Sequence, residues 1–426
     1  MTLTPSRRLY GLGAIMLAAL VGCAKIPGGV GAPPYLITLA IAGVAYLFAL
    51  REFFRTPRYA RHVILICLAL AALWRVPFLL MPPGGLDDTR RYVWDGRLQR
   101  LGYNPYAVIP RDPAFAALHT ADTRELNNPD VPTPYPAGAE LFFRAITAIH
   151  ESPFAFNAAF VICDLGIVLL LLVELRRVGL GEHWVLAYAW HPLLVTDLAA
   201  SGHVDILGVL LLLVSAAALG RRWRATAAIA FGLAVAVKLL PIVLTPLFWR
   251  RVRLRDGLIA ALVVAMLYVP FLEHGRIPIG SLGAFVQRFR FNDPVFAILE
   301  RFLGAYVAAG VALLLGFATA IWLRRKQPSC SPDAWVWPMA VSLVCAPVVY
   351  PWYLLWFLPF LRSVPTLPLA VWSVSIISTH FVWYLHDFGA PWRVPLWITL
   401  FEYGSAVAAA ASAFILLRRS ARSRIF

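Results

Sequence analysis

The chain has 426 residues, of which 60% are hydrophobic and 14% are charged, and its formal net charge is +16. A soluble globular protein averages about 25% charged residues, so this chain has too few charges to cover a water-facing surface. Its basic residues stand in short clusters between apolar runs, which is typical of cytoplasmic loops and argues against nucleic-acid binding. Composition and charge therefore indicate a membrane protein.

Apolar runs that can span, or nearly span, a bilayer recur from one end of the chain to the other. Inside lipid the backbone must satisfy its own hydrogen bonds, and the runs lack the period-two alternation of barrel strands, so we expect helices. The prediction is an all-α polytopic membrane protein with about 12–14 transmembrane or half-spanning helices. The runs fall at residues 9–24, 35–50, 63–81, 154–174, 184–199, 204–219, 225–237, 239–249, 257–272, 304–323, 335–349, 352–361, 365–385 and 395–417.

The first run follows Arg7 and Arg8 and ends at Cys23, a pattern that also resembles a lipoprotein signal. We favour a first transmembrane helix because it fits the runs that follow, and a cleaved signal is the alternative. The five cysteines show no CxxC spacing, so we expect neither a disulfide framework nor a metal site from them.

The basic clusters predict the topology. If all of them face the cytoplasm, successive apolar runs can cross the membrane in alternating directions with every basic cluster on the same side. Both termini are then cytoplasmic, and the chain is a multi-pass protein of the plasma (inner) membrane. Two short hairpins are then needed, with breaks at Lys238–Pro241 and Tyr350–Trp352, where proline frees backbone groups. The polar segments 82–153 and 273–303 lie outside, and the lack of a tandem repeat favours one membrane-embedded domain, residues 1–426. The clusters are Arg7-Arg8, Arg51 to Arg61, Arg176-Arg177, Arg221 to Arg224, Arg250 to Arg255, Arg324 to Lys326, Arg362 and Arg418 to Arg424.

The first outer loop, residues 82–153, holds a dense group of acidic and basic residues. Asp87 and Asp88 suit the first turn of a helix, where a carboxylate favours the helix dipole. On that helix Asp88, Arg91 and Asp95 share one face. A carboxylate beside Arg stays ionised and can act as a general base, and Arg can hold a phosphate with two hydrogen bonds. A capped helix with surface ion pairs is the alternative reading of the same residues.

Other polar residues stand next to or within the apolar runs. Lys238 lies at a hairpin break, where it either snorkels to the interface or meets an anionic ligand. His203 and Asp205 lie at an outer turn, which is either a substrate contact or a turn with a capping Asp. Asp164 lies inside a run, so we expect it to pair with another helix. Glu140 to His150 is an amphipathic stretch that suits the membrane interface.

Aromatic residues accompany the remaining polar candidates. In the second outer segment, residues 273–303, Arg288 and Arg290 alternate with Phe and precede Asn292, which suits a surface that is partly lipid and partly phosphate. Simple membrane anchoring is the alternative there. Trp352 and Tyr353 belong to an aromatic group that forms either an interfacial belt or a platform for a sugar ring.

A set of short motifs in a fixed order resembles a known family. The run Asp-Asp-Thr-Arg-Arg-Tyr-Val-Trp-Asp-Gly and the Gly-Tyr-Asn-Pro-Tyr that follows it resemble the first outer loop of bacterial GT-C superfamily glycosyltransferases. The polyprenyl-phosphate-mannose-dependent mannosyltransferases are the most similar type. The later motifs are Asn127-Asn128-Pro129 to Tyr135-Pro136, Gly-His-Val-Asp, Val-Lys238-Leu-Leu-Pro241, Arg288 to Asn292, and Tyr-Pro-Trp-Tyr-Leu-Leu-Trp.

The resemblance implies a GT-C-like bundle with a helical first outer loop and a transferase site on the outer face of the membrane. The activity implied is sugar transfer, with mannose expected, from a polyprenyl-phosphate donor to a glycan or lipid acceptor. Asp88 is the first choice for the general base and Asp87 the second, and one displacement would invert the anomeric centre. The donor-phosphate candidates are Arg91, Lys238, Arg288 and Arg290, and the residues expected to line the site are Asp95, Asn104, Tyr106, Tyr135, His203, Asp205, Asn292, Trp352 and Tyr353.

Two other functions compete with this prediction. A lipid or sugar transporter, including a flippase, would spread charge through the membrane depth and show matching repeat halves. A glycan ligase or polymerase that uses a lipid-diphosphate donor would share the architecture and differ in donor and acceptor. We expect no cofactor. A divalent metal at Asp87 and Asp88 is not favoured, because adjacent carboxylates on a helix point to different sides.

Overall fold

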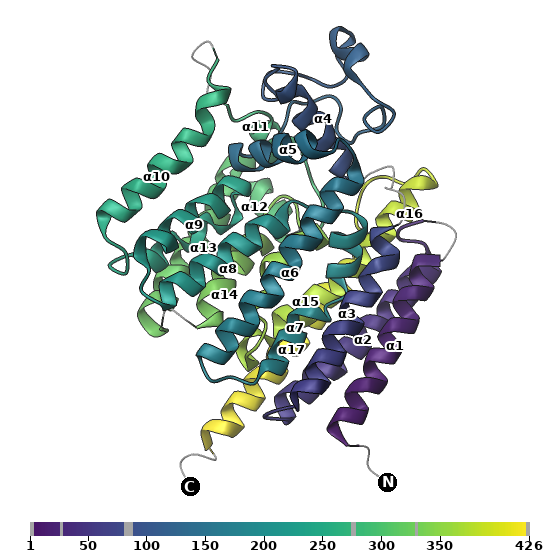
Figure 1. The fold of residues 1–426 in the computed structure, drawn as a ribbon, viewed down its shortest axis with the longest axis vertical. Helices are drawn as coiled ribbons and strands as arrows, with labels where there is room; N and C mark the ends of the chain where they lie inside the picture. Colours follow the sequence, from purple (N-terminus) through teal and green to yellow (C-terminus); the bar gives the residue numbers. More distant parts are fainter. Residues whose placement is uncertain (1–3, 26–28, 81–87, 274–277, 329–330, 423–426) are drawn as a thin grey trace.

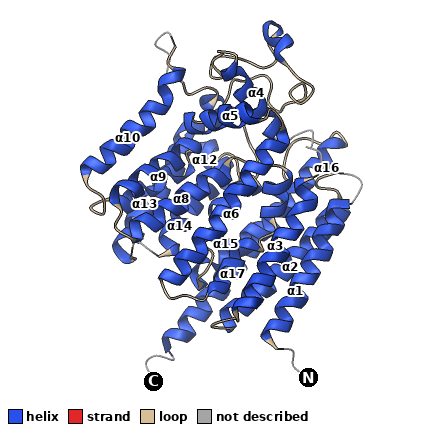
Figure 2. Cartoon of the chain, in the orientation of Figure 1, coloured by secondary structure: helices blue, strands red, loops and turns tan. Residues whose placement is uncertain are grey.

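The computed structural model describes residues 4–25, 29–80, 88–273, 278–328 and 331–422. The described residues form helices and no strand, apart from one isolated bridge between Phe291 and Val348 (Figure 2). Eight of the described helices are long and apolar enough to cross a membrane, and a bent pair makes a ninth if it counts as one span. The prediction of an all-α polytopic membrane protein is confirmed.

The first half of the chain contains most of the elements that build the polar loop region. Prolines start several helices, since a missing N–H costs nothing in the first turn. The elements are α1 (Pro5–Lys25), α2 (Pro33–Arg55), α3 (Arg61–Leu79), α4 (Asp88–Arg100), η1 (Pro113–Leu118), α5 (Ala137–Ile149), α6 (Pro153–Arg177), η2 (Glu182–Trp184), α7 (Val185–Ala189), the π-helix η3 (Leu194–Ala200) and α8 (Asp205–Gly220).

The second half alternates short 3-10 segments with longer apolar helices. Its elements are α9 (Arg224–Val237), η4 (Leu240–Phe248), α10 (Leu254–Tyr268), η5 (Val269–Phe271), α11 (Leu282–Arg288), α12 (Pro294–Leu303), α13 (Ala305–Lys326), α14 (Pro332–Val344), η6 (Pro351–Trp356), η7 (Leu358–Phe360), η8 (Val364–Thr366), α15 (Leu367–Ser375), η9 (Ile376–His380), α16 (Phe381–Asp387) and α17 (Leu396–Arg422).

The molecule has two opposite ends. Figure 1 shows the N- and C-termini at one end of the tilted bundle and the loop helices α4 and α5 at the other. We call these the terminal end and the loop end. Helices α8 and α9 connect them. Val204, just before α8, donates to the Tyr92 hydroxyl of α4 at the loop end, and α9 returns to contact α5 after a turn at the terminal end.

Both predicted hairpin breaks are present. Helix α9 ends at Val237, and Lys238 is extended before the 3-10 segment η4 begins. The second hairpin ends its helix at Val344, and η6 begins at Pro351. A third break separates η3 from α8, which meet at 115°. Each hairpin is therefore divided into two short segments where proline and polar residues interrupt helical hydrogen bonding.

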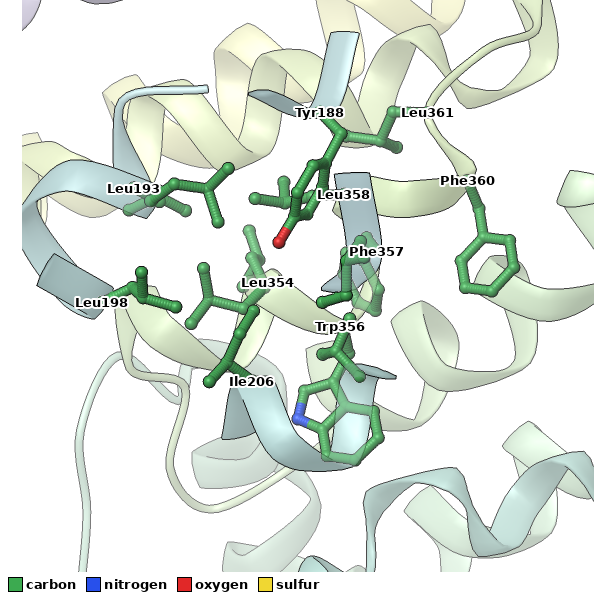
Figure 3. Packing of buried hydrophobic residues seen from close by; sticks show 14 of the residues in the cluster. Tyr188, Leu193, Leu198, Ile206, Leu354, Trp356, Phe357, Leu358, Phe360 and Leu361 are labelled. Atoms are coloured by element: carbon green, nitrogen blue, oxygen red, sulfur yellow. The ribbon is translucent and has the colours of Figure 1, made fainter. Parts of the chain in front are cut away.

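The breaks are held by tightly packed apolar side chains. Figure 3 shows Leu354, Trp356 and Phe357 of the second hairpin packed near Leu198 of η3 and Ile206 of α8, all of them buried. Burying a large apolar side chain stabilises a fold by about 1.5–3 kcal/mol. This packing fixes the irregular backbone at the loop end, where the candidate site lies.

A buried ion pair ties α3 to α6. Asp164 Oδ2 accepts a hydrogen bond of 2.8 Å from Arg75 Nε, and Asp164 Oδ1 accepts one of 2.7 Å from the Tyr188 hydroxyl. The expectation that Asp164 pairs with another helix is confirmed. Charged residues inside an apolar bundle are costly unless they are paired in this way.

Basic side chains at the terminal end join neighbouring helices. Arg8 of α1 pairs with Glu52 of α2 at 3.4 Å, and Arg221 after α8 pairs with Glu174 of α6. Arg324 donates to the carbonyl of Trp249 at 3.1 Å, which joins the end of α13 to the turn before α10. Arg8, Arg221 and Arg324 come from three of the predicted basic clusters, and each lies at the end of its helix that is away from the loop helices.

Candidate active site

Asp88, the first residue of α4, lies at the centre of the polar residues at the loop end. Its Oδ2 atom lies 3.2 Å from His203 Nδ1 and accepts from the hydroxyls of Tyr135 at 3.3 Å and Tyr92 at 3.4 Å. Its Oδ1 atom accepts a close hydrogen bond from the Asn127 amide. The side chain of Asp88 keeps 17% of its surface exposed, so a ligand has access to the carboxylate.

The local sequence explains why these groups converge. Tyr92 is one helical turn after Asp88, and its ring stacks on Phe143 of α5 with centroids 4.3 Å apart. The turn before α8 contains Gly202 at a φ of +62°, where a Cβ atom would lie 2.0 Å from Asn157 Oδ1. Only glycine suits this position, and the turn it permits brings His203 against Asp88.

Asp88 is kept ionised by its neighbours. Burial raises the pKa of this carboxyl, but the His203 hydrogen bond and charge, the Asn127 amide and the Lys238 ammonium together lower the pKa below its usual value. An ionised carboxylate can only accept, so His203 must carry its proton on Nδ1 in this arrangement. The carboxylate is therefore ready to take a proton.

A second charged pair stands beside Asp88. Lys238 Nζ lies 2.7 Å from Asp205 Oδ2 and 3.8 Å from the centroid of the Tyr353 ring. The indole N–H of Trp356 donates to Asp205 Oδ1 at 2.7 Å. Asp205 is buried, whereas Lys238 keeps 20% of its side chain exposed. Asp205 and Tyr353 thus hold the ammonium in place, while part of the Lys238 side chain stays exposed.

Stacked rings fix the orientation of His203. Its imidazole stacks on Trp352 with centroids 3.9 Å apart and planes 9° apart. Trp352 in turn stacks on Tyr350 at 4.3 Å, and Tyr350 contacts Phe291 at 4.4 Å. These ring contacts support the imidazole of His203. They also link the second polar segment to the site.

Arg91 and Asp95 lie elsewhere, inside the loop region. Arg91 Nε donates to both oxygens of Asp95 at 3.1 and 2.9 Å, and one Nη atom donates to the carbonyls of Asn128 and Val131. Their side chains are 3% and 0% exposed. Burial raises the pKa of Asp95 and of the neighbouring Glu140. Arg91, expected to share a working face with Asp88, is instead engaged within the fold.

The other predicted site residues are dispersed. Arg288 is exposed at the end of α11, and Arg290 is occupied by Glu300 and three backbone carbonyls. Asn292 is buried and donates to Glu402 at 2.9 Å.

Two loop residues act on the backbone. The Asn104 amide donates to the Phe271 carbonyl at 3.0 Å, and the Tyr106 hydroxyl donates to the Tyr135 carbonyl at 2.8 Å. Tyr106 therefore supports a residue that contacts Asp88. Asp87, the second choice for the base, lies outside the described residues.

Sequence reasoning missed three contributors to the site. Asn127 and Tyr92 stood inside quoted motifs, yet their contacts with Asp88 depend on how the loop folds. Trp356 reads as one more aromatic residue, and only its indole N–H contact with Asp205 assigns it to the site. Among the described residues, no group of three or more His, Cys, Asp or Glu side chains could hold a metal ion.

Comparison with known families locates this site in a recognised domain. The family model for the alpha-(1->6)-mannopyranosyltransferase N-terminal domain matches residues 24–252, more than half of the chain. The matched region contains Asp88, Asn127, His203, Asp205 and Lys238. No curated protein and no solved structure matches the chain.

Proposed function

Because the chain belongs to the alpha-(1->6)-mannopyranosyltransferase family, and is thus a membrane mannosyltransferase, we propose that its donor is a polyprenyl-phosphate mannose. The acceptor is a hydroxyl of a glycan or a lipid. The observation that carries the proposal is the pair of groups at the loop end: Asp88, which is partly exposed and has a lowered pKa, beside Lys238, whose side chain is 20% exposed.

These two groups match the two demands of a displacement at an anomeric carbon. Asp88 Oδ2 takes the proton of the acceptor hydroxyl as the oxygen attacks the anomeric carbon. The bond from that carbon to the phosphate oxygen breaks, and the electron pair leaves with the polyprenyl phosphate. Lys238 stabilises the negative charge that grows on the leaving oxygen. A single displacement inverts the configuration at this carbon.

Three polar groups around Asp88 Oδ2 suit this role. His203, Tyr92 and Tyr135 approach it at 3.2–3.4 Å, longer than tight hydrogen bonds to a carboxylate. An acceptor hydroxyl can therefore compete for this oxygen. Asn127 holds the other oxygen and fixes the direction of the carboxylate.

We place the loop end on the outer face of the plasma membrane and both termini in the cytoplasm. The support is the set of basic residues at the opposite end, which includes Arg8, Arg221 and Arg324. Basic loops remain in the cytoplasm. A lipid-linked donor suits an outer site, because its apolar chain can stay in the bilayer while its phosphate reaches Lys238.

The test is a transfer assay with purified protein in detergent. Radiolabelled polyprenyl-phosphate mannose is offered with a mannose-containing acceptor, and a nucleotide-linked mannose is offered in parallel. We expect product from the lipid donor alone. Product from the nucleotide donor, with none from the lipid donor, would overturn the proposed donor class while leaving the family assignment intact.

A further inference from the structure

A strongly basic hollow lies at the terminal end, a helix length away from the candidate active site. It has a volume of about 370 Å³ and is formed by the turn between α8 and α9 and the turn before α10. Its lining includes four exposed arginines and one acidic residue. They are Arg222, Arg224, Arg253, Arg255 and Asp256.

The charge of this hollow is largely uncompensated. Asp256 is buried, lies 3.4 Å from the Arg255 Nε and also accepts from the backbone N–H of Arg253, so it offsets at most one of the four guanidinium charges. Nearby basic residues at the terminal end are paired with carboxylates. Arg177 and Arg221 share Glu174, and Arg176 pairs with Glu182 at 2.8 Å. An anion would therefore gain more here than at the neighbouring clusters.

Backbone conformation points the same way. Arg222, which lines the hollow, has a φ value of +62°, and Arg250, which belongs to the second turn but does not line the hollow, has a φ value of +58°. Glycine or asparagine suits this left-handed region, and an arginine there costs backbone energy. Both turns thus keep an arginine where a different residue would fold more easily. At Arg222, which lines the hollow, such strain suggests that the charge itself is needed.

Apolar side chains flank the arginines. Trp223, Trp249 and Leu254 belong to the same two turns and are 59%, 71% and 80% exposed. Tryptophan next to arginine is typical of the headgroup level of a bilayer, where the indole meets the acyl boundary and the guanidinium meets phosphate. A soluble anion would not contact these apolar side chains, whereas a lipid would.

We propose that this basic hollow binds the headgroup of an anionic phospholipid. The lipid phosphate lies among the four arginines, and its acyl chains run beside Trp223, Trp249 and Leu254 into the bilayer. The site joins α8, α9 and α10 at the end away from Asp88. It does not rest on the proposed function, and its test does not require catalytic activity.

The test compares the thermal stability of the full chain in a neutral detergent with added lipid. A ligand that binds only the folded state raises Tm. We expect phosphatidylglycerol to raise Tm by about 3–5 °C and phosphatidylcholine to raise it by less than about 1 °C. Inorganic phosphate at millimolar concentration should have no effect. An equal rise with inorganic phosphate, or no rise with phosphatidylglycerol, would overturn the proposal.

Two variants separate a defined site from diffuse surface charge. Arg224→Gln/Arg253→Gln should lose most of the rise caused by phosphatidylglycerol. The control Arg58→Gln/Arg61→Gln, which changes a second basic hollow on the chain, should keep it. Equal losses in both variants would contradict a specific site.

A third variant guards against misfolding. Arg222→Gly relieves the left-handed backbone, so its Tm without lipid should equal or exceed that of the wild type. Its rise with phosphatidylglycerol should be smaller. A full rise in this variant would contradict the placement of the lipid phosphate among the four arginines.

Discussion

Two groups of charged residues on one short helix, α4, have opposite properties. At its start, Asp88 is partly exposed, accepts from four side chains and has a lowered pKa. Two turns later, Asp95 is fully buried against Arg91 and has a raised pKa. Residue types and spacing do not distinguish these carboxylates. Burial and partners do, and they indicate chemistry at the first and structure at the second.

The largest expected effect is the loss of turnover when the Asp88 carboxylate is removed. Asp88→Asn keeps the shape of the side chain but cannot take a proton, so turnover should fall by about 10²- to 10⁴-fold. Binding of the donor, measured by its protection of Tm, should be retained. The control Asp130→Asn changes an exposed carboxylate in the same loop and should leave turnover unchanged. Near-normal turnover in Asp88→Asn would reject the base.

The next effect should appear in stability. Arg91→Met leaves Asp95 buried without its partner, which typically costs about 3–5 kcal/mol. We expect a clearly lower Tm in detergent and less folded protein in membranes. Arg111→Met removes an arginine that is 66% exposed from the same loop and should change Tm little. A normal Tm in Arg91→Met would remove the structural interpretation of this pair.

A smaller effect is expected at the phosphate position. Lys238→Met/Asp205→Asn removes both charges of the pair, so no carboxylate is left buried alone. The KM for the donor should rise by about 10-fold or more, because a charge-assisted contact with phosphate is lost. Turnover at saturating donor should fall as well, because Lys238 also stabilises the charge that grows on the leaving oxygen. An unchanged KM would indicate that Lys238 only anchors its helix end at the interface.

The smallest expected effect is a shift in the pH dependence of activity. His203 lowers the pKa of Asp88, and a base acts only when ionised, so activity should persist in mild acid and fall as pH drops through that lowered pKa. His203→Phe keeps a ring on Trp352 but removes Nδ1, so the acid limb of kcat/KM should move to higher pH. His203→Gln, which keeps an N–H donor, should move it less. If the acid limb of kcat/KM stays at the same pH in both variants, His203 does not lower the pKa of Asp88.

Much of the fold was predictable because membrane helices follow local rules. Apolar runs located the spans, and prolines located the breaks after Val237 and before Pro351. The amphipathic stretch beginning near Glu140 corresponds to α5. Family membership was also predictable, since motifs in order carry more information than any one of them.

The site was only partly predictable, because its contacts join distant parts of the chain. Spacing on a helix suggested Asp88 with Arg91, whereas the fold pairs Arg91 with Asp95 and brings His203 to Asp88 from 115 residues away. Asn292 likewise meets Glu402 across 110 residues. Helical periodicity says which residues share a face, but it does not say what covers that face.

The most direct measurement compares two matched substitutions on α4, Asp88→Asn and Asp95→Asn. Each removes one carboxylate charge without changing side-chain size. Turnover per folded molecule with polyprenyl-phosphate mannose, and Tm, are recorded on the same preparations. We expect Asp88→Asn to lose turnover and keep its Tm, and Asp95→Asn to lose Tm and keep turnover per folded molecule. The reverse pattern, a stable but inactive Asp95→Asn beside an active Asp88→Asn, would contradict the assignment of the base.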